Sequence, residues 1–94
     1  RLRGAEQALD GMVIDAWQDL NSATLAAQAS ELRHSAAREA LRGIKLEAKV
    51  GAKPTLAVLD AEREAIAAES DLLDAQAMRL KAAWRLNALT GRQD

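Results

Sequence analysis

The chain has 94 residues, of which 49% are hydrophobic but only 2% aromatic, and its formal net charge is −1. This length allows one small domain, and an apolar content made mostly of alanine favours long, closely packed helices or coiled coil over a wide globular core. The balanced charge excludes the basic surface of a nucleic-acid-binding protein, the lack of cysteine excludes disulfide and thiolate chemistry, and no apolar run is long enough to span a bilayer.

We expect a first helix over about residues 5–50. Its beginning is weak, because Gly4 and Gly11 each cost a helix roughly 1 kcal/mol relative to alanine. From Leu9 onward apolar and small residues recur in heptads, which is typical of coiled coil. This first seam consists of Leu9, Val13, Ala16, Leu20, Ala23, Ala27, Ser30, His34, Ala37, Leu41, Ile44 and Ala48. A second apolar series lies on another face and consists of Leu25, Ala29, Leu32, Ala36, Gly43, Leu46 and Val50.

Poor helix formers at 21–24 raise the alternative of a break near Asn21, which would give three helices instead of two. The heptad phase continues through this stretch without a shift, so we favour one unbroken helix. The chain begins at Arg1 rather than at a methionine, and we expect it to be a processed or excised piece of a longer protein.

The chain should reverse direction at a tip over residues 51–53. Gly51 can adopt the left-handed conformation that ends a helix, and Pro54 suits the first turn of the next one. Basic residues precede this tip and acidic residues follow it, which is the arrangement that complements both helix macrodipoles. These charged residues are Lys45, Lys49, Lys53, Asp60, Glu62 and Glu64.

The second helix should cover about residues 54–90, with Gly91 as its C-terminal cap. It also has two apolar series. One consists of Leu59, Ile66, Leu73 and Leu80, interleaved with Ser70, Ala77 and Trp84. The other consists of Ala61, Ala65, Ala68, Leu72, Ala75, Ala82, Leu86 and Leu89.

The pattern therefore predicts an all-α fold, with residues 1–94 forming one long antiparallel two-helix coiled-coil hairpin. Trp17 and Trp84 are nearly equidistant from Gly51, so we expect them at the same height and packed against each other. A two-helix hairpin can bury one stripe per helix, and the other stripe then becomes an interface. We therefore expect self-association.

One constellation could support chemistry. Glu31 and His34 form a Glu-x-x-His step, and the fold brings Glu69 near the same height, so a dimer of hairpins could form a di-metal carboxylate bundle. The simpler interpretation makes His34 a packing or hydrogen-bonding residue of the seam. No phosphate-binding loop or nucleophile elbow is present, and the mixed charge disfavours a membrane-surface helix. We expect no catalytic activity and no cofactor.

Several segments resemble TolC-like outer membrane channel proteins, and most closely the branch that serves type I secretion and efflux. Around the tip the resemblance is carried by Gly51, Thr55 and the run Val58-Leu59-Asp60-Ala61-Glu62. Elsewhere it is carried by Asp15–Leu20, Ala36–Gly43, Glu47, Val50, Arg63-Glu64 and Leu86–Gly91. The order and spacing of these segments cover nearly the whole chain.

The resemblance implies a trimer with two hairpins per subunit, whose helices form a periplasmic α-helical barrel below the outer membrane. Cargo passes through the lumen, an inner membrane transporter drives it, and a periplasmic adaptor docks at the hairpin tips. This chain would be the second hairpin. The adaptor-facing tip would consist of Val50, Gly51, Ala52, Lys53, Pro54 and Thr55.

Asp60 matches an acidic position that narrows the periplasmic entrance in this family, whereas the second acidic position of that motif is Ala57 here. Pro54 replaces the more common threonine or serine. An alternative is the helical hairpin of a periplasmic adaptor, which has similar heptads and would be flanked by β-rich, lipoyl-like halves.

Overall fold

The computed structural model describes residues 2–91, and the side chains of residues 4–91. It contains two α-helices, α1 (Leu2–Lys49) and α2 (Thr55–Thr90), and no strand within the described range. The all-α prediction is confirmed, and the helix bounds agree closely with the expected ranges. α1 runs unbroken through residues 21–24, so the alternative with three helices is wrong. No described helix is long and apolar enough to cross a membrane.

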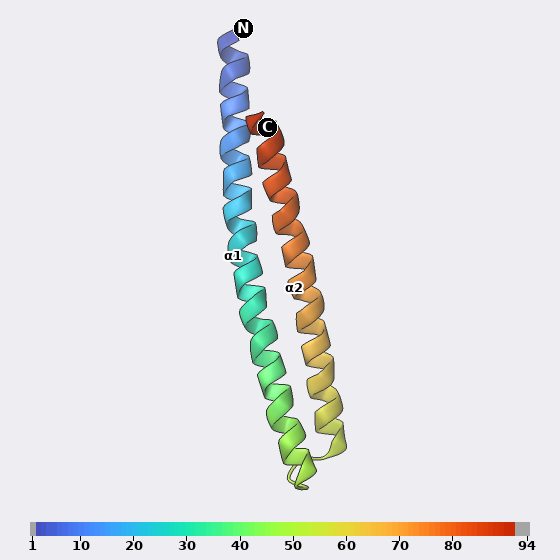
Figure 1. The fold of residues 1–94 in the computed structure, drawn as a ribbon. Coiled ribbons are helices and arrows are strands. Elements are labelled where there is room, and N and C mark those ends of the chain that lie inside the picture. The colour runs from blue at the N-terminus through green and yellow to red at the C-terminus, as the bar shows by residue number, and fades with distance from the viewer. Residues whose placement is uncertain (1, 92–94) are drawn as a thin grey trace. The chain divides into compact units, whose positions relative to one another are not determined.

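The chain divides into two compact units. The tip unit consists of Gln28–Asp74, and the terminal unit consists of Arg1–Ala27 together with Ala75–Asp94. In the tip unit, the green end of α1 and the yellow start of α2 lie side by side and are joined by the turn (Figure 1). In the terminal unit, an ion pair links the two helices, since the guanidinium of Arg85 donates to the carboxylate of Asp19 at 2.6 Å.

The inner seam of α1 matches the first predicted seam from Val13 to Ala48. Each of these residues is buried or half-buried, while the other residues of this stretch are exposed except for the half-buried Thr24. Leu9 is the exception, since 47% of its surface is exposed. Leu9 is exposed because α2 is too short to reach it. The Asp19–Arg85 pair sets the register, and five residues further from the tip α1 is at Ile14 while α2 ends at Thr90. Leu9 lies beyond the end of its partner helix.

On α2, the series that faces α1 is the alanine-rich one. Ala61 and Ala65 are buried, and the remaining members from Ala68 to Leu89 are half-buried. The series that contains Leu59, Ile66 and Leu73 is exposed throughout. Both helices therefore turn one apolar stripe toward each other and one toward solvent, as the two stripes per helix predicted.

The interior is narrow because small side chains fill it. The buried apolar residues are Ala16, Ala27, Ala61 and Ala65, and no large side chain among those described is fully buried. Ser30 is the one buried polar residue described, and its hydroxyl accepts a hydrogen bond from the Arg33 guanidinium at 3.0 Å. Since the hydrophobic effect scales with the apolar area removed from water, so small a core stabilises the isolated hairpin only modestly.

Candidate functional site

The tip begins with a Schellman motif that ends α1. The Gly51 amide donates to the Ala48 carbonyl at 3.1 Å, and the Ala52 amide donates to the Glu47 carbonyl at 2.8 Å. Gly51 has a φ of 80°, the left-handed conformation that this motif requires and that glycine adopts without a steric penalty. The predicted helix stop is confirmed. Gly91 has a φ of 71°, which likewise fits the predicted end of α2.

The second half of the tip starts α2. Pro54 directly precedes the first helical residue, and its carbonyl accepts a hydrogen bond from the Ala57 amide at 3.0 Å. α2 thus begins at Thr55, one residue after the predicted start. All six predicted tip residues, from Val50 to Thr55, are exposed, and Val50 is the most exposed large apolar side chain described, at 80%. The tip is a short, exposed turn that backbone hydrogen bonds join to both helices.

Asp60, the predicted entrance residue, lies on α2 beside an open groove of the tip unit. The groove is lined by three alanines and Ile44 of α1 and by Ala57, Asp60, Ala61 and Glu64 of α2. Asp60 is exposed, and Glu64 lies one helical turn further along on the same side. The sequence analysis predicted a site residue here only at Asp60. The spacing of four residues would also have placed Glu64 on the same side of the helix.

The acidic residues of α2 do not act on the macrodipole as expected. Lys49 does lie in the last turn of α1, but the first turn of α2 contains no acidic residue. Because the macrodipole acts within about one turn of the helix end, Asp60 and the acids after it lie too far along α2 to complement it. Their placement requires another explanation.

The two helices of the tip unit carry opposite charge. Residues 28–49 include five basic and three acidic side chains, whereas residues 55–74 include six acidic side chains and one basic. The only ion pair within residues 28–74 joins Glu39 and Arg42 on the same helix, at 3.0 Å. The excess charges of α1 and α2 are therefore not neutralised across the hairpin.

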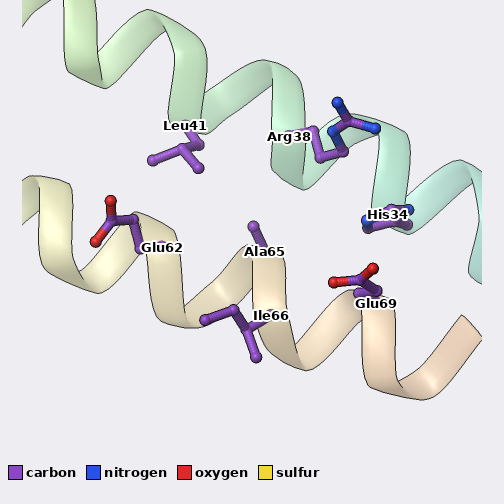
Figure 2. A pocket seen from close by; sticks show the side chains of 7 residues that line it. All are labelled: His34, Arg38, Leu41, Glu62, Ala65, Ile66 and Glu69. Atoms are coloured by element: carbon purple, nitrogen blue, oxygen red, sulfur yellow. The ribbon is translucent and has the colours of Figure 1, made fainter.

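A second groove lies on the other side of the tip unit and is shown in Figure 2. Its apolar floor includes Leu41 and Ala65, and His34 faces Glu69 across the two helices. Glu31, the third residue of the metal hypothesis, does not line this groove. Within the described residues no group of three or more His, Cys, Asp or Glu side chains could hold a metal ion. One hairpin therefore brings together only two of the three predicted ligands.

The lateral faces of the hairpin carry the most exposed apolar surface. We call the two exposed series the outer stripes. Each outer stripe also includes the one charged residue that fits its heptad spacing, Glu39 on α1 and Arg63 on α2. The α1 outer stripe consists of Leu25, Ala29, Leu32, Ala36, Glu39, Gly43, Leu46 and Val50. The α2 outer stripe consists of Leu59, Arg63, Ile66, Ser70, Leu73, Ala77, Leu80 and Trp84. All of these residues are exposed, and Figure 2 shows Ile66 pointing away from α1 while Ala65 points toward it.

The two tryptophans belong to the terminal unit, and the neighbouring Asp19–Arg85 ion pair confirms that they lie near the same height. Trp17 and Trp84 are 52% and 70% exposed, which does not fit the expected packing of one indole against the other in a buried pair. Trp84 belongs to the exposed series of α2 instead, so its indole adds exposed apolar surface to the terminal unit.

The chain matches no protein-family model, no curated protein and no solved structure. Its functional interpretation therefore rests on the geometry of the tip and of the outer stripes.

Proposed function

We propose that this chain is a hairpin of a TolC-like outer membrane channel, and that it serves type I secretion or efflux as a wall element of a periplasmic α-helical barrel. It acts as a conduit and docking element rather than as an enzyme. The observation that carries the proposal is the pair of outer stripes. A closed barrel of helices needs two lateral contact faces on every helix, and each helix here has a second apolar face left open by its partner.

In this proposal the tip docks a periplasmic adaptor, through which the channel meets an inner membrane transporter. The exposed residues from Val50 to Thr55 form the docking surface, and the Schellman motif holds them in one backbone conformation. A preorganised turn costs less conformational entropy on binding than a flexible one. Asp60 and Glu64 lie one turn further up and would supply the acidic lining of the entrance.

The docking role is tested with Lys53→Glu in the full channel protein. This substitution reverses a charge at the centre of the tip and leaves the backbone of Gly51 unchanged. We expect lower export and weaker crosslinking to the adaptor, while the trimer persists. Lys45→Glu, the same charge reversal on the exposed flank of α1, serves as the matched control and should export normally.

Unchanged export and crosslinking with Lys53→Glu would remove the docking role.

The sequence that flanks this hairpin in its full protein separates the proposal from the adaptor alternative, because adaptor hairpins are inserted between two β-rich halves.

A further inference from the structure

The terminal unit has a groove between its two helices that the proposed function does not use, and we call it the terminal groove. Its volume of about 610 Å³ falls within the range of about 300–1,000 Å³ that is typical of small-molecule sites. Its floor is apolar and consists of Ala23, Ala26, Ala75, Met78 and Ala82. Met78 is 62% exposed, and its unbranched, polarisable side chain can adapt to ligands of different shape.

The rim of the terminal groove carries one cation without an anionic partner. Three charged side chains line the groove: Asp19, Lys81 and Arg85. Asp19 and Arg85 neutralise each other, since their side chains form the ion pair at 2.6 Å. Among the side chains described in the terminal unit there is no other ion pair, so the positive charge of Lys81 is left over.

The surroundings of Lys81 explain why it has no anionic partner. On its own helix, the residues three and four positions away on either side are Ala77, Met78, Trp84 and Arg85, and none is acidic. Across the groove, the Asp19–Arg85 pair sets the register, and one turn nearer the tip Lys81 lies level with Ala23. Lysine can lay its methylene stem along such an apolar surface and keep its ammonium in water.

The groove beside Asp60 in the tip unit has a similar apolar lining but the opposite charge. Three heptads separate Asp60 from Lys81, so the two residues have the same place in the repeat. The same interval separates Glu64 from Arg85. An anionic ligand is therefore attracted to the terminal groove and repelled from the groove beside Asp60.

We propose that the terminal groove binds a single anionic amphiphile, a molecule with an apolar chain that ends in a carboxylate. The apolar chain lies over the alanine floor and Met78, and the carboxylate pairs with the ammonium of Lys81. The inference goes beyond the proposed function and does not rest on it. None of the lining residues belongs to an outer stripe, so the lateral contacts of the proposed barrel do not use them.

The test is NMR spectroscopy of the purified chain, labelled with ¹³C at its methionine methyl groups and titrated with laurate below its critical micelle concentration. The chain has two methionines, of which Met78 lines the terminal groove and Met12 does not. We expect laurate to shift the Met78 signal in a saturable way and to leave the Met12 signal unchanged. Dodecyltrimethylammonium has a chain of the same length and a cationic head, and should bind at least about threefold more weakly.

Lys81→Glu should weaken laurate binding at least about threefold, because it replaces an attraction by a repulsion at the carboxylate. Arg79→Glu is the matched control: it makes the same change in net charge on the same helix but lies outside the terminal groove, and should bind laurate as the wild type does. Circular dichroism confirms that each variant keeps its helices.

Four results would overturn the proposal. Absence of any Met78 shift would mean that no such site exists, and equal shifts of both methionines would mean that laurate coats the chain without a site. Equal losses of affinity with Lys81→Glu and Arg79→Glu, or no loss with either, would remove the role of Lys81. A Met78 signal that shifts with protein concentration alone would show that a second copy occupies the groove.

These outcomes are independent of the docking experiment. Lys53 lies in the tip unit, so Lys53→Glu should bind laurate as the wild type does even where it blocks adaptor binding. Failure of the tip effect refutes the docking role alone, and failure of laurate binding refutes only the present inference.

Discussion

Replacing Gly51 with alanine is expected to destabilise the hairpin because of backbone conformation alone. Gly51 has a φ of 80°, and a Cβ built there meets no atom within 4 Å. The left-handed conformation costs a residue with a Cβ about 1–2 kcal/mol. Alanine also restricts the unfolded chain, which offsets about 0.4–1 kcal/mol of that cost. The net result is a loss of about 1 kcal/mol.

Gly43→Ala is the matched control, because the same substitution should have the opposite sign there. Gly43 lies inside α1, its φ is not positive, and a Cβ built there also meets nothing within 4 Å. Alanine should therefore stabilise the helix by up to about 1 kcal/mol. Thermal unfolding followed by circular dichroism at one fixed protein concentration measures both, and 1 kcal/mol corresponds to a shift of about 4–8 °C in Tm.

The reasoning also predicts that Gly51→Asn recovers much of the loss, since asparagine tolerates the left-handed region better than alanine. A Gly51→Ala chain that is as stable as the wild type, or that gains stability as Gly43→Ala does, would refute the assignment of the turn.

Two adjacent residues of α2 should respond in opposite ways. Ala65 is buried where α2 packs against α1, so the larger side chain of Ala65→Leu would force the helices apart. This substitution should destabilise the hairpin by about 1–3 kcal/mol in chemical unfolding. Ile66 is 66% exposed on the α2 outer stripe, so Ile66→Ser should leave the stability of a dilute monomer within about 0.5 kcal/mol but weaken self-association measured by sedimentation. Asp19→Ala breaks an ion pair whose side chains are about half exposed, so its effect on unfolding should stay below about 1 kcal/mol; a larger loss would show that the terminal unit depends on that pair.

The turn and the inner seam of α1 could be predicted from the sequence because local chemistry determines them. Gly51 and Pro54 are the strongest helix-stop and helix-start signals in the chain. In α1, only the inner seam continues in heptads without a charged residue. The structure changed these predictions only at the ends. Leu9 lacks a partner because α2 is shorter than α1. The heptad pattern of α1 alone does not show where its partner helix ends.

Which stripe of α2 faces α1 could not be predicted, because both series follow the same heptad period. The series with larger side chains offers more apolar area, yet Leu59, Ile66 and Leu73 are exposed while Ala61 and Ala65 are buried. Alanine on both facing surfaces lets the helices approach closely, and the bulky residues are then left for other contacts.

The central claim is that the outer stripes are covered by neighbouring helices when the protein works. The chain lacks cysteine, so single cysteines can report this directly through their rate of thiol labelling in the assembled protein. Ile66→Cys on the α2 outer stripe should be strongly protected, while Glu64→Cys, two residues away on the open flank, should be labelled rapidly. Equal, rapid labelling at both positions would contradict the account.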